Sequence, residues 1–580
     1  MWRAAALVIG PALVLGGCGA SGPEGEVLRV AVVGDQGGAA PLARQMADDM
    51  LRPRLIERDA AGQLVGGLAS SWRFLDDGSA LILRLRPARW SDDRPLVAAD
   101  VVSAFTRSSR PPAPAQGFRM ALIAGADDMA RGLRRASLGV GAPTPRVVEL
   151  KLAAPSPLLL EWLAEPEMGV GAAGKGQNLP TLARYVEVEA AEGQRLPPSS
   201  LAAYGLVPVA RLRRLAQVPS PEAMPAEVHV LATAATDKAV AAFRRGEVDI
   251  VLSEGLAGLG EARVAAGRRD TLRLDPLAGV YGWRANALKG PLADAGLRRA
   301  LADLVDRTAL VSRFGIAALR PEAGLLPPAL RPLPPETVAQ TDDVASPAPG
   351  VAAGLRRAAG VVGGVVGGAV GDVMGGAANA LTGGGRMDES RFAVRQAEVR
   401  ALVLAARMQA VGRMAESGGD ALAANAGDEL PPLRLTLLLP PGREHRTIAE
   451  RVAADWRVLG VELMVKVADR ETRTRLIGNG DFDLAVDETS TRVMDPAALL
   501  ERFRCGAGPH CNPAADSLLS AARLSPPAER ARLLASAELV LLSGPPLIGL
   551  FTPVRWALVS PDVQGWVANP AGHPLGRLSR

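Results

Sequence analysis

The sequence predicts an α/β protein with two lobes, because a strand–helix–strand pattern occurs in two stretches that lie nearly 200 residues apart. The expected strands are residues 228–231 and 248–252 in the first stretch, and 433–439, 461–467 and 481–486 in the second. Amphipathic helices are expected between the strands, at 238–245 and at 447–459. Alternation of this kind is typical of parallel sheets. Each stretch therefore predicts one lobe.

The remaining elements follow from shorter patterns. Apolar or alternating runs predict strands at 28–34, 80–86 and 147–152. Between the two stretches the chain is mainly helical in character. Leu297 and Leu301 share a helical face, Asp306 is expected to cap the helix that follows, and residues 396–414 resume a helical pattern.

Length and composition limit the class of protein. The 580 residues are enough for two or three domains, and a hydrophobic content of 48% allows large cores. The net charge is only +5, which argues against a dedicated nucleic-acid binder. The four histidines and three cysteines lack zinc-finger or metalloprotease spacing, and the sequence has no nucleophile elbow or phosphate-binding loop. We therefore expect no enzyme activity, no cofactor and no metal.

The first residues are typical of a secretory leader. Residues 4–15 are apolar, too few for a membrane span of about 20 residues, and the run ends in the sequence LGGC at Cys18. This sequence resembles a bacterial lipobox, in which the cysteine is lipidated and becomes the new N-terminus. It implies a signal peptide at 1–17, a lipid on Cys18 and a tether at 18–27. The alternative is an ordinary secretory signal that contains a cysteine.

Two later cysteines, Cys505 and Cys511, bracket a short loop-forming run that contains His510. In an oxidising envelope, two cysteines this close favour a disulfide. Metal binding by the two cysteines and His510 is the alternative, although it leaves the fourth ligand unnamed.

Residues 334–392 differ in composition from the rest of the chain. Prolines precede a tract of Gly, Ala and Val at 350–385, in which glycines recur at four-residue steps. Glycine disfavours a helix by about 1 kcal/mol per residue, which favours a flexible insertion. The alternative is a hairpin that contacts a membrane or a partner, because GxxxG spacing lets helices pack closely in lipid.

Residues 68–107 carry the most specific motifs. A Leu-Ala pair and Trp72 are followed by an Asp-Gly turn, an alternating strand, Trp90-Ser-Asp, Pro-Leu, and Asp100 before two valines. These motifs, in this order, resemble those of the extracellular solute-binding proteins of family 5, the oligopeptide-, dipeptide- and nickel-type receptors of ABC importers. Asp93 stands where that family prefers glycine. Further matches in the family's order lie at 244–250, 291–310, 480–484, 495–496 and 511–516, so the resemblance covers nearly the whole mature chain apart from the insert.

Two departures from the family's pattern concern the ligand. The family's glycine-rich turn near the end of the first third is absent from residues 185–207. In peptide-binding members, an aspartate three residues before an acidic-proline pair holds the ligand's amino terminus. Here that position is Arg492, before the pair at 495–496, and a cation repels an ammonium group. Arg492 either holds a carboxylate or phosphate through a bidentate fork, or it points away or pairs with Asp487 or Glu488.

The resemblance implies a ligand site between the lobes. Tyr281, Trp283 and Asn286 lie at the expected crossover between the lobes, and Arg492 and Asp495 lie in the family's ligand-binding segment. We expect these five residues to contact the ligand. For the two aromatic residues, packing in the core is the alternative.

The implied fold is a two-lobed periplasmic binding protein of type II, from the large cluster with an extra small domain. The expected domains are 28–70, 185–282 and 545–580 for the first lobe, 71–184 for the small domain, and 283–544 for the second lobe with its insert at about 334–392.

The implied function is capture of a peptide or a related small solute and its delivery to an ABC permease and ATPase complex. The receptor is expected to be a monomer in the periplasmic space that contacts the membrane through its lipid anchor only. The alternative is a non-transporting family member that serves as a structural or partner-binding envelope lipoprotein.

Overall fold

The computed structural model describes residues 27–34, 39–75, 78–109, 122–133, 137–156, 158–172, 179–188, 199–215, 224–267, 270–316, 318–331, 389–416, 430–572 and 575–579. The predicted signal peptide, Cys18 and the Gly/Ala/Val tract of the insert lie outside these ranges.

A seven-stranded sheet forms the first lobe, in the order β12-β18-β11-β1-β10-β9-β8. β1 (Val27–Val33) lies parallel to β10 (Glu227–Thr233) and β11 (Ile250–Glu254). The outer strands run antiparallel to their neighbours and are β8 (Tyr185–Glu187), β9 (Val207–Arg214), β12 (Leu272–Pro276) and β18 (Val554–Val559). The prediction of a parallel sheet is therefore right only at the centre, because β9 leads directly into β10 and β18 returns from the second lobe.

A five-stranded sheet forms the second lobe, in the order β15-β14-β16-β13-β17. Its parallel part is β14 (Leu433–Leu439), β15 (Val461–Val467) and β16 (Leu484–Ser490), connected through α14 (Arg443–Arg457) and α15 (Arg470–Asn479). Its antiparallel part is β13 (Gly279–Ala285) and β17 (Leu547–Phe551). The predicted alternation is confirmed, although the strand expected at 481–486 begins three residues later.

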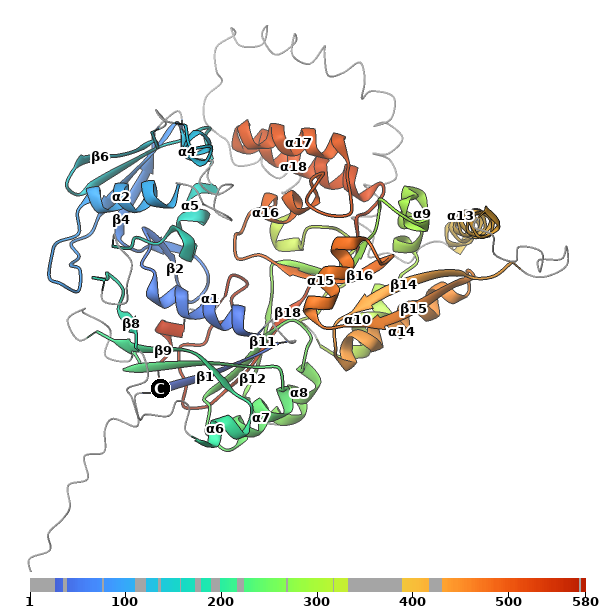
Figure 1. The fold of residues 1–580 in the computed structure, drawn as a ribbon, viewed down its shortest axis with the longest axis horizontal. Helices are drawn as coiled ribbons and strands as arrows, with labels where there is room; N and C mark the ends of the chain where they lie inside the picture. Colours follow the sequence, from blue (N-terminus) through green and yellow to red (C-terminus); the bar gives the residue numbers. More distant parts are fainter. Residues whose placement is uncertain are drawn as a thin grey trace, which may run out of the picture.

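The chain passes between the two sheets at two places (Figure 1). It leaves the first lobe after β12 and enters β13, and it returns between β17 and β18. The backbone N–H of Leu277 donates to the carbonyl of Pro553 at 3.0 Å, so the two crossing segments contact each other. Because β17 pairs with β13, the return follows Phe551, whereas the expected domain boundary lies at 544–545.

A smaller unit contains an antiparallel sheet in the order β4-β5-β7-β6. Its strands are β4 (Ala69–Phe74), β5 (Ala80–Leu85), β6 (Val140–Thr144) and β7 (Val147–Lys151), with α2 (Ala98–Ser108), α4 (Ala126–Ala130) and α5 (Leu158–Leu163) beside them. The motif-rich segment folds here. Trp90 is buried and its indole N–H donates to Asp100 at 3.2 Å. Asp93 has a φ of 68°, a left-handed conformation that glycine adopts most readily, which accounts for the glycine preferred at this position.

Helices cover both lobes. The first lobe carries α1 (Ala39–Leu51), α6 (Ser199–Ala203), α7 (Thr236–Arg244) and α8 (Leu259–Ala266), and the short hairpin β2 (Ile56–Arg58)–β3 (Leu64–Gly66) follows α1. The second lobe carries α9 (Ala295–Asp303), α10 (Arg307–Phe314), α13 (Glu389–Glu416), α16 (Ala497–Leu500), α17 (Pro513–Leu524) and α18 (Pro527–Leu542). Asp306 caps α10 as predicted, because its side chain accepts from the N–H of Ala309. No helix among the described residues is long and apolar enough to cross a membrane.

Candidate functional site

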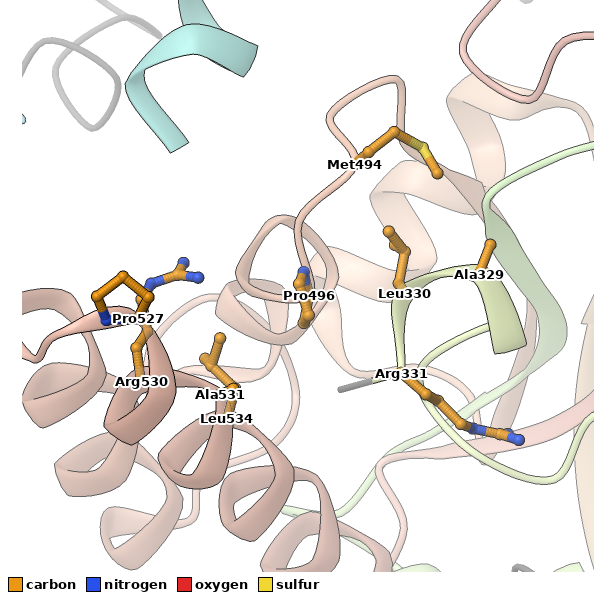
Figure 2. Close-up of a pocket in the computed structure, with 9 residues that line it drawn as sticks. All are labelled: Ala329, Leu330, Arg331, Met494, Pro496, Pro527, Arg530, Ala531 and Leu534. Atoms are coloured by element: carbon orange, nitrogen blue, oxygen red, sulfur yellow. The ribbon is translucent and has the colours of Figure 1, made fainter. Parts of the chain in front are cut away.

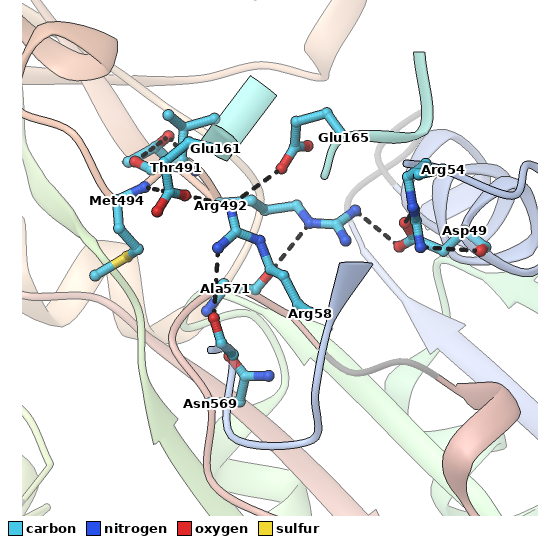
Figure 3. Close-up of polar contacts among 12 residues, drawn as sticks. Asp49, Arg54, Arg58, Glu161, Glu165, Thr491, Arg492, Met494, Asn569 and Ala571 are labelled. Atoms are coloured by element: carbon cyan, nitrogen blue, oxygen red, sulfur yellow. Dashed lines mark hydrogen bonds and ion pairs between the residues drawn. The ribbon is translucent and has the colours of Figure 1, made fainter. Parts of the chain in front are cut away.

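The segment 491–496, which follows β16, lies against the first lobe and the small unit (Figure 3). Arg492 Nη1 is 2.8 Å from Asp49 Oδ2 on α1, and its Nε donates to the carbonyl of Ala571 at 2.9 Å, beyond β18. Arg492 therefore joins the second lobe to the first. Its ion-pair partner is Asp49, whereas Asp487 and Glu488 were the predicted candidates.

Arg492 is part of a larger group of charges that we call the interlobe ion cluster. Its members are Asp49, Arg54, Arg58, Glu161, Glu165 and Arg492. Arg54 Nη1 is 2.7 Å from Asp49 Oδ1, and Arg58 Nη2 is 2.5 Å from Glu161 Oε2. The same oxygen of Glu161 accepts from the backbone N–H of Met494 at 3.2 Å. Three arginines face three carboxylates, so the formal charges of the cluster cancel.

Burial and charge oppose each other in this cluster. Burial disfavours ionisation of Asp49, but the positive charges of Arg492 and Arg54 outweigh it and lower the pKa of this carboxyl below its usual value. At Glu165, burial is the stronger effect and raises the pKa in spite of Arg492 and Arg58. Burial also disfavours the charged form of Arg492, but Asp49 and Glu165 raise its pKa. Arg492 thus stays charged, and carboxylates of the protein neutralise that charge.

Two further glutamates of the second lobe accept hydrogen bonds from the first lobe. Glu488 Oε1 accepts from the backbone N–H of Leu256 at 3.1 Å, and Glu444 Oε1 accepts from that of Gly260 at 3.3 Å. Gly255 has a φ of 103°, and a Cβ there would lie 2.5 Å from the carboxylate of Glu488. Glycine at 255 therefore permits this close approach of the two lobes.

Asp495 is buried, and its neighbours Met494 and Pro496 line a small pocket of about 230 Å³ (Figure 2). Its carboxylate binds both Nη atoms of Arg530, at 2.7 and 2.8 Å, and accepts from the N–H of Ala497. The pocket is lined by Ala329, Leu330, Arg331, Met494, Pro496, Pro527, Arg530, Ala531 and Leu534. Typical ligand pockets measure about 300–1,000 Å³. This pocket is therefore too small for a whole peptide, and Asp495 holds the loop beside it.

The three residues predicted at the crossover have structural partners. Tyr281 is fully buried, stacks on Phe551 with ring centroids 4.6 Å apart, and its hydroxyl is 2.8 Å from Nδ1 of His445. Trp283 is fully buried and forms a T-shaped contact with Trp456, with ring centroids 5.6 Å apart. The Asn286 amide donates to the carbonyls at 480 and 482. Their contact with a ligand stays a prediction, and this packing does not support it.

The described cysteines Cys505 and Cys511 are joined by a disulfide. His510 between them is buried, and burial lowers its pKa to about 4. The lipidation predicted at Cys18 lies outside the described residues.

Sequence reasoning missed Asp49, Arg54, Arg58, Glu161 and Glu165. The pair between Asp49 and Arg492 joins residues more than 400 positions apart, so no local pattern indicates it. A usable signal did exist in the apolar run at 158–165. Two glutamates interrupt that run, Glu161 and Glu165, which is unusual unless a cation pairs with them.

Comparison with known proteins shows which family this chain resembles. The family model described as bacterial extracellular solute-binding proteins, family 5, matches residues 63–369, just over half of the chain. The periplasmic oligopeptide-binding protein OppA of Escherichia coli K12 is 24% identical over 289 residues, which is 47% of this chain and 50% of that protein. The match thus spans half the length of that relative.

Solved structures show the same fold. OppA of Burkholderia pseudomallei matches with a TM-score of 0.67 and 20% identity, covering 96% of this chain and 99% of that one. OppA of Haemophilus influenzae in complex with the peptide RPPGFSPFR matches with a TM-score of 0.67 and 18% identity, with the same coverage. The murein tripeptide binding protein MppA of Escherichia coli gives 0.66 and 19%, covering 96% and 98%. The predicted two-lobed fold is confirmed, and the chain belongs to the bacterial extracellular solute-binding proteins of family 5.

Proposed function

We propose that this chain is the solute-binding component of an ABC importer and captures a peptide or a related small solute between its lobes. The observation that carries the proposal is the way the lobes meet. Only the crossings at β12–β13 and β17–β18 connect the two sheets among the described residues, and Arg492 on 491–496 meets the first lobe at Asp49. Such lobes can close about a hinge around a ligand.

The relatives support a peptide as the ligand. One is named an oligopeptide-binding protein, and another was solved in complex with a nine-residue peptide. In an extended peptide the backbone provides most of the hydrogen bonds, so a receptor can tolerate many side chains. The closed receptor would then present its ligand to an inner-membrane permease and its ATPase.

Arg492 sets a limit on how such a ligand binds. Its charge repels a free amino terminus, and it occupies Asp49, a carboxylate that could otherwise accept an ammonium group. Glu165 Oε1 is buried and makes no hydrogen bond among the described residues, but it lies 3.6 Å from Arg58 Nη2, so a ligand that used this oxygen would compete with Arg58. A peptide with a free amino terminus should therefore bind only if it displaces Arg492.

We further propose that the receptor is a periplasmic lipoprotein held at the membrane by a lipid on Cys18. The family is described as extracellular, and the Escherichia coli relative is named periplasmic. A lipid anchor would keep the receptor close to its permease.

Native mass spectrometry of the chain purified gently from its host tests the function. We expect a series of adducts with the masses of short peptides. After the bound peptides have been removed, an added peptide pool should restore these adducts. Arg492→Ala should raise the affinity for peptides with a free amino terminus at least tenfold, because it removes the repelling charge and releases Asp49. Arg44→Ala, which removes an exposed arginine of an ion pair with Glu187, should leave it unchanged. A protein without adducts, and without a shift in melting temperature on adding the pool, contradicts the proposal.

The engagement of Arg492 favours a second candidate, a non-transporting lipoprotein that binds an envelope partner. Its lobes would stay closed on each other through the interlobe ion cluster instead of on a solute. This candidate predicts the same compact lobe arrangement with and without peptide, which small-angle X-ray scattering measures. A solute receptor should become more compact on adding the peptide pool.

A further inference from the structure

β15 is an edge strand of the second lobe, and no described strand pairs with its outer side. Among the described strands it pairs only with β14, beside which it lies in Figure 1. In the strand order it is at the opposite end of the five-stranded sheet from β17. Met464, Val465 and Val467 are 47%, 43% and 45% exposed. Edge strands with exposed apolar side chains readily pair with another strand unless charges prevent it.

The hydrogen bonds to β14 show which residues of β15 direct their backbone groups away from that strand. The carbonyl of Gly460 accepts from the N–H of Leu433, and the N–H of Ala468 donates to the carbonyl of Leu439. The even-numbered residues of β15 therefore direct their backbone N–H and C=O groups toward β14. The odd-numbered residues from 461 to 467 direct theirs away from it. Antiparallel pairing requires that outward-facing residues lie opposite one another.

We infer that β15 pairs antiparallel with β15 of a second copy of this chain, with Met464 on the two-fold axis. In this register Glu462 lies opposite Lys466 of the second copy, and Lys466 lies opposite its Glu462. On the other face Leu463 lies opposite Val465, and Val461 opposite Val467. The strand VELMVKV is thus complementary to itself in charge and in apolar character.

Other two-fold registers that also place outward-facing residues opposite one another bring the charged side chains into less favourable positions. Moving the axis by one residue to 463 or 465 places one of the charged residues opposite Met464 and the other beyond the paired region. Moving it to 462 or 466 places like charges opposite each other, which is destabilising. Charges that normally protect an edge strand therefore select one register here.

The register agrees with the hydrogen-bonding parity of the strand. With Met464 on the axis, residue 461 pairs with 467 and residue 463 with 465, and all four have outward-facing backbone groups. Glu462 also lies 2.9 Å from Arg434 on β14, so it would sit between two cations. Pairing would join the two five-stranded sheets into one continuous sheet and cover Met464, Val465 and Val467.

This interaction is independent of the proposed solute function. It replaces the expectation of a monomer by a weak dimer, because pairing through one short edge buries less than a standard interface of about 1,600 Å². A weak contact is best detected by covalent trapping.

The test is disulfide trapping in the full chain with Met464→Cys. Two residues directly opposite in a non-hydrogen-bonded antiparallel pair have Cα atoms about 4.5 Å apart, within disulfide range. Mild oxidation with diamide should therefore give covalent dimer on a non-reducing gel, at least fivefold more than Val264→Cys, a control on α8 that is more exposed than Met464. Equal yields from the two variants would overturn the inference.

Charge reversal tests the register. In the Met464→Cys background, Glu462→Lys alone or Lys466→Glu alone places like charges opposite each other, and each should reduce the dimer to the control level. Mixing the two differently tagged variants should restore trapping, as mixed dimers only, because opposite charges then face each other again. This rescue excludes misfolding as the cause of the loss. Undiminished dimer in the single variants, or failure of the mixture to restore it, would refute the register.

Discussion

Two regions of the second lobe meet the first lobe through different forces. At the crossings, Tyr281, Phe551, His445 and Phe314 form a group of rings that we call the hinge stack. Tyr281 and Phe551 belong to a hydrophobic cluster with members from both sheets, and Phe314 packs against it. At 491–496 the contact is the interlobe ion cluster. Apolar burial is short-ranged and is little affected by salt, whereas ion pairs weaken with water access and screening. We therefore expect the lobes to pivot at the hinge stack and to separate at the ion cluster.

The largest expected effect comes from emptying the hinge stack. Phe551→Ala removes a fully buried ring that contacts Tyr281 and Phe314, and such truncations cost about 3–5 kcal/mol of unfolding free energy. Urea denaturation measures this loss. Phe482→Ala is the control, because Phe482 is buried in a separate small cluster of the second lobe. Both variants should lose stability, but only Phe551→Ala should also change the radius of gyration. Equal radii for the two variants would mean that the hinge stack does not set the lobe arrangement.

The hinge stack is expected to sense acid through His445. Burial, followed by the positive charge of Arg473, lowers the pKa of His445 from 6.5 to about 4. Because the folded-state pKa is depressed, the neutral ring contributes stability above pH 6.5, and this contribution is lost as the pH falls toward 4. Its full size is about 3 kcal/mol.

Urea midpoints at pH 7 and pH 4.5 measure this loss. His445→Gln should reduce the difference between the two midpoints, because the variant has no imidazole to protonate at the hinge. His510→Gln is the matched control, since His510 is also buried with a pKa of about 4 but lies beside the disulfide. His510→Gln should remove only the contribution of His510 to the loss of stability between pH 7 and pH 4.5, and the contribution of His445 should remain. If His445→Gln loses as much stability between pH 7 and pH 4.5 as the parent protein does, protonation of His445 does not destabilise the hinge stack.

The two regions also differ in how far the sequence predicts them. The parallel core strands follow from local apolar periodicity, and β15 matches its predicted range residue for residue. Asp93 was identified by its motif as a position for glycine, and its backbone is left-handed. The partner of Arg492 could not be found in this way, because Asp49 lies on another lobe and the pairing depends on tertiary geometry. Tyr281 and Trp283 show the converse difficulty: position near a crossover does not tell whether an aromatic ring faces the ligand or the core.

The smallest expected effect, and the sharpest test of the comparison, is the coupling between Arg492 and Asp49. A double-mutant cycle with Arg492→Ala and Asp49→Ala should give a coupling energy of about 1–2 kcal/mol, since the pair is largely buried at 2.8 Å but the expected separation of the lobes would hydrate it. Arg44 and Glu187 form the control pair at 2.7 Å, with both side chains 41% exposed, and their coupling should stay below about 1 kcal/mol.

Salt distinguishes a contact that opens from one that is permanently enclosed. If the interlobe ion cluster is the side that separates, 1 M sodium chloride should reduce the Arg492–Asp49 coupling toward that of the exposed pair, because the open state admits ions to both charges. The stability loss of Phe551→Ala should be unchanged by the same salt. A coupling that persists in 1 M salt would place the ion cluster in the rigid part of the molecule, and the lobes would then have to pivot somewhere other than the hinge stack.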